Sequence, residues 1–301
     1  MTRRLVLAVR VSLVILLGGI ALATIALPLW SSFEERAAEA DLRKLGASFS
    51  EAKSGGRMVE LPTRISDETL TKEGPHLEKA DIAHLFLPHS NITSLEPLKG
   101  LTNLRSLDLN DAIGVTSLEP LKGLTNLSSL DLSYATGITS LEPLKGLTNL
   151  RSLNLRNATG ITSLEPLKEL TKLSSLNLNG ATGITSLEPL KGLTNLTSLN
   201  LNSATRITSL EPLKGLANLN SLDLSDAIGI TSLEPLKEVT ALSWLTLINV
   251  TGITSLEPLK GLPNLSKIYL NDAKGITSLE PLKGQGVQIY GASDELLATM
   301  E

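Results

Sequence analysis

The chain of 301 residues contains no cysteine, only three histidines, and aromatic residues make up 3% of it. Without cysteine there can be no disulfide framework and no thiolate metal ligand. The histidines, His76, His84 and His89, all precede the regular repeats described below, and the sequence has no glycine-rich phosphate loop and no metal-ligand spacing. These absences argue against catalysis. We therefore expect a protein that is not an enzyme, with no catalytic residues, no cofactor and no metal site.

An excess of positive charge is also lacking. The net charge is −4, and the isoelectric point is about 5.6. Nucleic-acid-binding surfaces are basic, so we do not expect nucleic acid as a partner. The Glu and Lys residues of the repeated block described next lie three positions apart and cancel one another, which is typical of a solvated outer face.

One block of eight residues dominates the chain and recurs at a constant step of 23 residues. It reads Ile-Thr-Ser-Leu-Glu-Pro-Leu-Lys at Ile92, and later copies begin at Val115, Ile138, Ile161, Ile184, Ile207, Ile230, Ile253 and Ile276. A fixed period of a few tens of residues indicates a solenoid. One unit is too small to fold alone, so neighbouring units must stack to bury their leucines.

Each unit has two halves with different periodicities. Leu107 and Leu109 alternate with Ser106 and Asp108, which predicts a short half-buried strand. Leucines spaced by three predict a 3₁₀ turn, and the first such set is Leu95, Leu98, Leu101 and Leu104. We expect a first strand at 85–87, eight more at the 23-residue step from Leu107 to Ile268, and a truncated last strand at 287–289.

The pattern Leu-x-x-Leu-x-Leu-x-x-Ala-x-x-Ile-Thr resembles the leucine-rich repeat, and it covers residues 82–290. The return segment, Leu-x-Pro-Leu-x-x-Leu-x-x-Leu, is similar to the short internalin-like class of bacterial repeats. This resemblance implies an α/β solenoid of about ten coils, with a parallel β-sheet on the concave face and 3₁₀ segments on the convex face.

The chain departs from the family pattern at one corner of the coil. The family's usual Asn is replaced by Val250 in one coil and by Ala in the others, at Ala112, Ala135, Ala158, Ala181, Ala204, Ala227 and Ala273. Another group must therefore supply the hydrogen bonds of the corner. Our candidate is the threonine column that begins with Thr93, Thr116 and Thr139.

Residues 1–30 have the pattern of a membrane segment. Arg3, Arg4 and Arg10 precede an uncharged run from Val11 to Trp30, which as a helix is about 30 Å long and can span a bilayer. The positive flank predicts a single-pass signal-anchor in the cytoplasmic (inner) membrane, with the N-terminus inside and the repeats outside the cytoplasm. The alternative is a cleaved signal peptide and a secreted or periplasmic protein, because small residues at 21–26 offer cleavage sites.

The solenoid is expected to carry a cap at each end, because its first and last leucine layers need shielding. Residues 31–81 predict a juxtamembrane helix over 32–45, a hairpin turn at 53–56 and a second short helix from Ser66 to near Gly74. Residues 291–301 predict a C-terminal cap helix that starts at Ser293.

Candidate binding residues come from comparing the outward positions of the strands between repeats. The first column is Ser from Ser106 to Ser221 and then changes to Trp244 and Lys267. The second is Asp or Asn and then changes to Thr246 and Tyr269, and a third ends with Ile248. Aromatic side chains on a small polar surface are frequent binding anchors. The alternative is that these residues pack beneath the C-terminal helix.

Two weaker candidates lie nearer the N-terminus. His84 and Phe86 interrupt the small polar surface, although contact with the cap is the better explanation for them. Asp108 and Asp131 should lie about 5 Å apart on adjacent strands, a spacing like that of glycosidase carboxylates, and they could contribute to a calcium site. We interpret them as a solvated polar ladder.

The function indicated is a membrane-anchored, extracytoplasmic recognition module. Its concave sheet would bind a protein, a peptide or an envelope glycan through Trp244, Thr246, Ile248, Lys267 and Tyr269. The uniform Ser and Asn columns instead favour a structural spacer or assembly element with no single specific ligand.

Overall fold

The computed structural model describes residues 33–53, 55–87 and 89–300, so the predicted anchor at 1–30 lies outside the described residues. Within the described ranges, no helix is both long enough and apolar enough to cross a membrane. Residues 33–44 are helical, and the two α-helices that follow the first strands are α3 (Asp67–Lys79) and α4 (Asp294–Leu297).

The strands form one sheet in the order of the chain. They are β1 (Ser48–Glu51), β2 (Arg57–Glu60), β3 (Ile82–Phe86), β4 (Ser106–Asp108), β5 (Ser129–Asp131), β6 (Ser152–Asn154), β7 (Ser175–Asn177), β8 (Ser198–Asn200), β9 (Ser221–Asp223), β10 (Trp244–Thr246), β11 (Lys267–Tyr269) and β12 (Gln288–Tyr290). Only β1 and β2 pair antiparallel, as the hairpin that the glycines at 55–56 predict. All later neighbours pair parallel, so the predicted leucine-rich repeat solenoid is confirmed.

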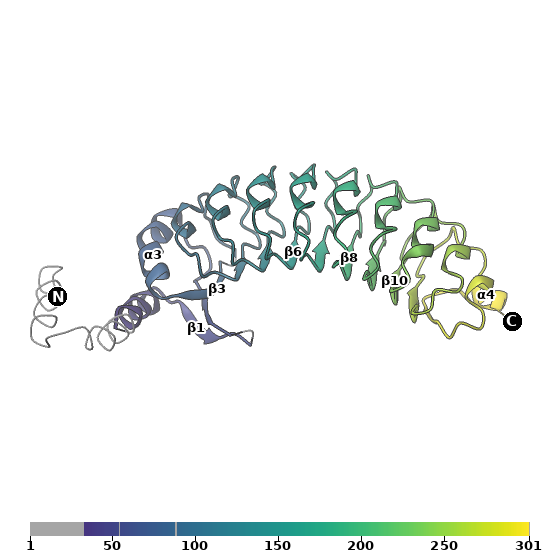
Figure 1. Cartoon of the computed structure of the whole chain (residues 1–301), viewed down its shortest axis with the longest axis horizontal. Helices are drawn as coiled ribbons and strands as arrows, with labels where there is room; N and C mark the ends of the chain where they lie inside the picture. Colours follow the sequence, from purple (N-terminus) through teal and green to yellow (C-terminus); the bar gives the residue numbers. More distant parts are fainter. Residues whose placement is uncertain (1–32, 54, 88, 301) are drawn as a thin grey trace, which may run out of the picture.

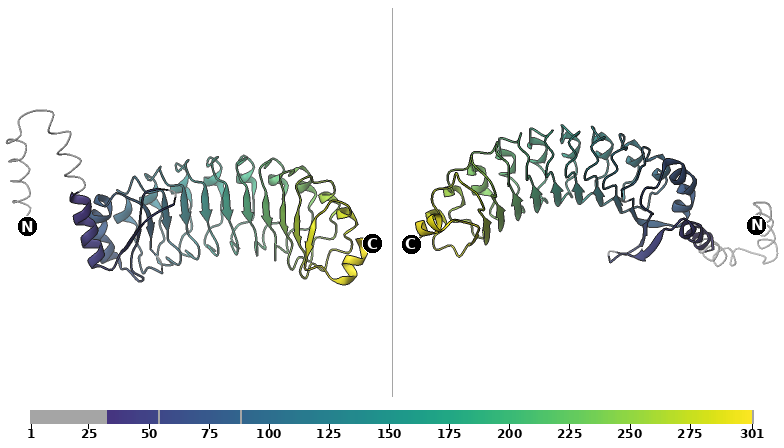
Figure 2. Two further views of the ribbon diagram at one scale, coloured as in Figure 1. Left: turned by 90° about the horizontal axis from the view of Figure 1, so that it is seen from below. Right: turned by 180° about the vertical axis from the view of Figure 1, so that it is seen from behind.

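The molecule is an arc, with the strands on its concave side and the 3₁₀ segments on its convex side (Figures 1 and 2). The 3₁₀ segments are η1 (Glu96–Leu98), η2 (Glu119–Leu121), η3 (Glu142–Leu144), η4 (Glu165–Leu167), η5 (Glu188–Leu190), η6 (Glu211–Leu213), η7 (Glu234–Glu238), η8 (Glu257–Leu259), η9 (Glu280–Leu282) and, in the C-terminal cap, η10 (Ala298–Met300). The two faces of the arc therefore differ in their elements, and the strand face lies inside.

The spacing of three between leucines has a direct counterpart in backbone hydrogen bonds. The amide of Leu98 donates to the carbonyl of Leu95, that of Leu101 to Leu98, and that of Leu104 to Leu101, at 2.9, 3.0 and 2.9 Å. Pro97 lies at the start of η1, where a backbone N–H would have no acceptor within the turn, so proline is tolerated there. The 3₁₀ prediction is therefore confirmed.

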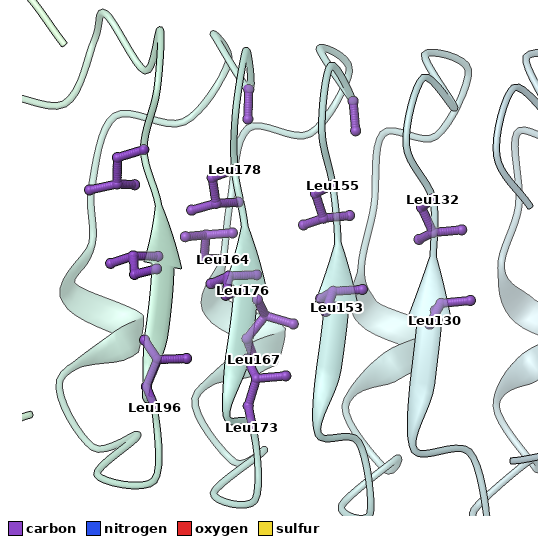
Figure 3. Packing of buried hydrophobic residues seen from close by; sticks show 14 of the residues in the cluster. Leu130, Leu132, Leu153, Leu155, Leu164, Leu167, Leu173, Leu176, Leu178 and Leu196 are labelled. Atoms are coloured by element: carbon purple, nitrogen blue, oxygen red, sulfur yellow. The ribbon is translucent and has the colours of Figure 1, made fainter. Parts of the chain in front are cut away.

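The core is a set of leucine columns that run across the coils. Leu130, Leu153 and Leu176 form one column, each at 1% exposure and in register between adjacent strands. These side chains point from the sheet toward the 3₁₀ segments and meet leucines such as Leu164 and Leu167 (Figure 3). Every coil thus covers the apolar layer of the next, and the apolar area removed from water stabilises the stack.

At the corner after each strand, the backbone supplies the hydrogen bonds that the family's Asn would make. The amide of Leu109 donates to the carbonyl of Asp131 in the next coil, and the amide of Asp111 donates to the carbonyl of Ser133. Ala112 is fully buried behind this ladder. The threonine prediction was wrong in its first member, because Thr93 bonds to Asp67 of the N-terminal cap instead of to a corner.

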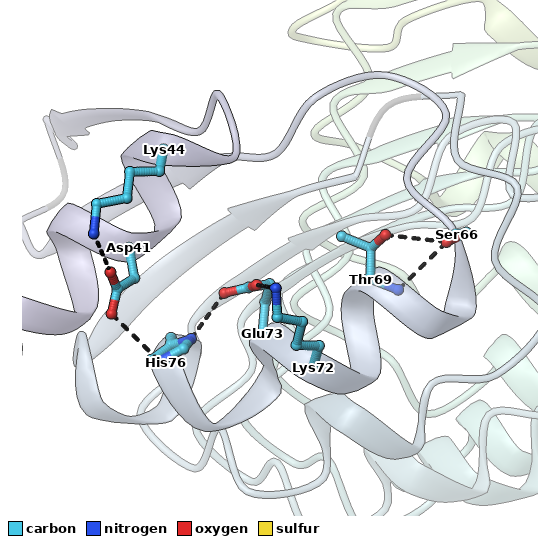
Figure 4. A network of polar contacts seen from close by, with 7 residues as sticks. All are labelled: Asp41, Lys44, Ser66, Thr69, Lys72, Glu73 and His76. Carbon is cyan, nitrogen blue, oxygen red and sulfur yellow. Dashed lines mark hydrogen bonds and ion pairs between the residues drawn. The ribbon is translucent and has the colours of Figure 1, made fainter. Parts of the chain in front are cut away.

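The N-terminal end is closed by the helix at 33–44, the hairpin and α3. Leu42, Val59 and Leu77 join the core of the first coils. The two helices are linked by His76, whose Nδ1 lies 2.8 Å from Glu73 and whose Nε2 lies 3.7 Å from Asp41 (Figure 4). Helix α3 continues to Lys79, past the predicted end at Gly74. Gly74 is buried inside the helix and packs against Pro97 of η1, where a Cβ would lie 3.0 Å from a carbonyl oxygen, so the glycine serves close packing and does not end the helix.

The C-terminal end differs from the prediction by one residue. Strand β12 covers 288–290 instead of 287–289, and Ile289 is in register with Ile268. This register keeps isoleucine on the inner side and turns Tyr290 outward. Helix α4 begins at the cap residue Ser293, whose hydroxyl accepts the amide of Leu296, and η10 then packs on η9.

Candidate functional site

The concave face of the last three strands carries a stack of three aromatic rings. Trp244 of β10 and Tyr269 of β11 have ring centroids 6.1 Å apart and planes 17° apart. Tyr269 and Tyr290 of β12 are closer, at 4.7 Å and 14°. The ammonium of Lys267 lies 4.6 Å from the centre of the Trp244 ring, within the range of a cation–π interaction. We call Trp244, Lys267, Tyr269 and Tyr290 the aromatic patch.

Strand alternation explains why these side chains project from the sheet. Leu245 and Ile268 lie between the outward residues and are fully buried in the core. Their neighbours must then point to the opposite face. Trp244 pairs in register with Lys267, and Thr246 pairs with Tyr269, so the patch spans two adjacent columns. Thr246 and Ile248 are partly exposed beside it.

The C-terminal cap packs on a different part of the last coil. Leu296 of α4 is the buried contact, and the hydroxyl of Thr299 accepts the amide of Leu279 next to η9 at 2.8 Å. Trp244 and Tyr290 are 41% and 39% exposed to solvent. These positions favour an open patch over rings that are packed beneath the helix.

The regular columns beside the patch have a structural role that the sequence did not reveal. In each regular coil the Asp or Asn side chain at the end of the strand accepts the amide two residues later. The acceptors are Asp108, Asp131, Asn154, Asn177, Asn200 and Asp223, with distances of 2.8 to 3.1 Å. This is an Asx turn that closes the corner of the coil. Thr246 and Tyr269 occupy the equivalent positions, so the last coils replace the acceptor of that turn with one residue beside the patch and one residue within it.

The Asp108 and Asp131 pair is explained by the same turns. Asp131 accepts the amide and hydroxyl of Ser133 with one oxygen and the Nδ2 of Asn154 with the other, at 2.8 Å for the last. Burial raises the pKa of Asp108, and the negative charge of Asp131 raises it further. The hydrogen bond from the amide of Asn110 and the charge of His89 lower the pKa but do not outweigh these effects. Among the described residues, no group of three potential ligands could hold a metal.

The second candidate, His84 with Phe86, lies against the N-terminal hairpin. The Nε2 of His84 is 3.3 Å from the carbonyl oxygen of Gly55, and β3 pairs with β2 over this stretch. Contact with the cap therefore accounts for both residues. The sequence did not predict Tyr290 as a candidate. The last strand was predicted at 287–289, so Tyr290 fell outside it, whereas β12 covers 288–290 and turns Tyr290 outward. The repeated alternation of isoleucine with aromatic residues in β11 and β12 was the available signal.

Comparison with known proteins agrees with this architecture. The family described as Leucine Rich repeats (2 copies) matches four overlapping segments at 125–169, 148–192, 171–215 and 194–238. No curated protein matches the sequence significantly.

Two solved structures have a similar fold. Internalin C2 from Listeria monocytogenes is 30% identical, with a TM-score of 0.51 over 62% of this chain and 80% of that chain. An internalin of the same organism, InlF, is 23% identical, with a TM-score of 0.50 over 81% and 84% of the two chains; this second likeness concerns the fold alone. The chain therefore belongs to the leucine-rich repeat proteins, and its coils have the architecture of the bacterial internalins.

Proposed function

We propose that the chain is a recognition module that binds a protein through the aromatic patch of its concave sheet. The leucine-rich repeat fold is typically a non-enzymatic scaffold for protein interactions. The observation that carries the proposal is the exposed ring stack at the end of an otherwise small polar face, with Trp244 41% exposed. Trp and Tyr are the residue types most often found as anchors of protein interfaces.

The binding residues in this proposal are Trp244, Thr246, Ile248, Lys267 and Tyr269, together with Tyr290. Lys267 holds its charge beside the Trp244 ring, and Ile248 adds apolar surface at the exit of β10. A glycan or short peptide could use the same rings. A protein partner is favoured because the patch continues into a curved polar sheet that can contact a large surface.

The proposal places this module outside the cytoplasm, held by an uncleaved membrane segment at 11–30. The uncharged length of that segment and its arginine flank support the placement. A reporter fused after residue 301 should be active only outside the cytoplasm. Reporter activity inside the cytoplasm would contradict this placement.

The binding proposal is tested with a pull-down that uses residues 31–301 as bait against extracytoplasmic proteins and envelope glycans. Trp244→Ala combined with Tyr269→Ala should then remove most of the affinity for the captured partner, because each anchor can contribute ~2 kcal/mol or more. The matched control is Ser152→Ala with Ser175→Ala on the regular part of the same face, which should bind normally.

Thermal unfolding of the double variant separates the proposal from its alternatives. A modest change in melting temperature with lost binding supports a binding patch. Intact binding with a large loss of stability would mean that the rings only seal the last coil. A structural spacer would show no saturable partner with either variant or with the unchanged chain.

A further inference from the structure

A second departure from the repeat pattern lies five strands from the aromatic patch, at the rim of β5 and β6. Tyr134 occupies the corner position that has a positive φ in every regular coil, and its own φ is 60°. The equivalent corners hold Asp111, Asn157, Gly180, Ser203, Asp226, Asn249 and Asp272. Small residues and Asn or Asp tolerate this left-handed conformation, whereas it is strained for a bulky side chain. The fold alone does not call for tyrosine here.

Arg156 departs from its own column at the same place. The equivalent positions of the other coils hold Asn110, Ser133, Asn179, Asn202, Ser225, Ile248 and Asn271. Its guanidinium lies 5.4 Å from the centre of the Tyr134 ring. The backbone joins the two residues, because the amide of Tyr134 donates to the carbonyl of Arg156 at 2.7 Å. Two substitutions in separate columns thus produce one aromatic and guanidinium pair.

The charge of Arg156 is available to a ligand. Among the residues that the structure describes, no carboxylate forms an ion pair with it, and its side chain is exposed. Asp131, the acidic side chain at the end of β5, is already engaged by Ser133 and Asn154. A guanidinium stacked on a ring keeps its planar donor edge free, and that edge matches the two oxygens of a carboxylate.

We propose that Tyr134 and Arg156 form a carboxylate-binding site for an acidic segment of a protein partner, on the rim of the concave face. Tyr134 orients the guanidinium, and Arg156 donates the hydrogen bonds. The site is separate from the aromatic patch, at roughly 19–24 Å for four to five strand spacings, and its test does not depend on the partner of that patch.

The test is a titration of the full-length chain, with its arginine side chains labelled with ¹⁵N, against an acetylated tetraglutamate peptide. The Nε–H signal of Arg156 should shift in a saturable way, and a tetraglutamine peptide should leave it in place. Arg105 and Arg151 provide the internal control, because both are exposed and, among the described residues, neither lies over an aromatic ring. Equal shifts of all three signals, or no shift of Arg156, would overturn the proposal.

Two variants sharpen the test. Tyr134→Asn places at this corner the residue found at positions 157 and 249, so it should raise the melting temperature while weakening tetraglutamate binding at least severalfold. Arg156→Lys keeps the charge without the planar fork and should also bind severalfold more weakly. Unchanged binding by both variants would reduce the pair to a surface contact with no ligand role.

Discussion

At the residue scale, one strand-end position carries Asp in some coils and Asn in others, and both close the corner through the same hydrogen bond. The two residues differ in charge. Burial raises the pKa of Asp108 above its ordinary value of 3.8, so the folded state disfavours the ionised carboxylate. Asn154 performs the same role without that cost.

Asp108→Asn should therefore stabilise the protein at pH 7, because the amide oxygen can still accept from Asn110. Because the pKa of Asp108 is raised in the folded state, its ionised form lowers the free energy of unfolding. The gain from Asp108→Asn is therefore full where Asp108 is ionised, and it disappears as the pH falls through the folded pKa toward 3.8. Urea unfolding at pH 7 measures the gain in stability, and urea unfolding at pH 3.5 measures its loss in acid. Asp131→Asn is the control, and it should bring no gain because Asp131 is held by three hydrogen bonds. Equal stability of Asp108→Asn and the unchanged chain at pH 7 would show that burial of the charge costs little.

The pKa of Asp67, in the N-terminal cap, is shifted in the opposite direction to that of Asp108. Burial alone would raise its pKa, but the hydroxyl and amide of Thr93 and the amide of Ser94 outweigh burial and hold the pKa below 3.8. Its ionised form therefore stabilises the contact of α3 with the first coil above about pH 4. That contribution is lost as the pH falls through the lowered pKa, so the cap should loosen in strong acid.

At the scale of one coil, glycine decides how closely neighbouring corners approach. A Cβ at Gly160 would lie 2.5 Å from the carbonyl oxygen of Ile138, whereas one at Gly146 would meet nothing within 4 Å. Both glycines have negative φ, so only the space around them differs.

Gly160→Ala should lower the free energy of unfolding by about 1–3 kcal/mol, since backbone must move to admit the methyl group. Gly146→Ala should be neutral or stabilise by ~0.4–1 kcal/mol through the unfolded chain. Arg206 fills the position equivalent to Gly160 in another coil, so we expect local adjustment and not a failure to fold. Denaturant unfolding of both variants compares them, and equal effects would show that the close approach is easily relieved.

The coil could be predicted in detail because its two periodicities are visible in the residues. The alternation around Leu107 gave the strand, and the spacing from Leu95 to Leu104 gave the 3₁₀ turn. The Asx turns were not predicted, although the column of Asp and Asn is periodic, because these side chains were interpreted as a solvated polar ladder. The left-handed corner was not predicted either, because several residue types occupy it. The comparison of strand columns found Trp244 and Tyr269 but not Tyr134, because Tyr134 lies at a corner, after the end of β5.

At the scale of the whole molecule, each coil contacts the coils before and after it, and the strands follow chain order throughout the described sheet. Stability is then approximately a sum of coil and interface terms. No central coil is indispensable in this arrangement.

Deletion of residues 152–174, one complete period, should leave a folded protein with a smaller denaturant m-value, because less surface is exposed on unfolding. Deletion of 152–162 removes half a period and should prevent folding, because the strand of one coil would then meet the 3₁₀ segment of the next. Circular dichroism and urea unfolding distinguish the two. A folded half-period variant would contradict the sequential stacking.

The sequential order of the sheet also determines how the chain responds to tension. Pulling at the two ends loads the terminal coils first, because no strand within residues 33–53, 55–87 and 89–300 crosses over to tie distant coils together. Each coil that peels away releases 23 residues, or about 80 Å of extended chain. A solenoid tethered at one end and attached to a partner at the other would therefore lengthen in repeated equal steps, as a molecular spring that yields one turn at a time.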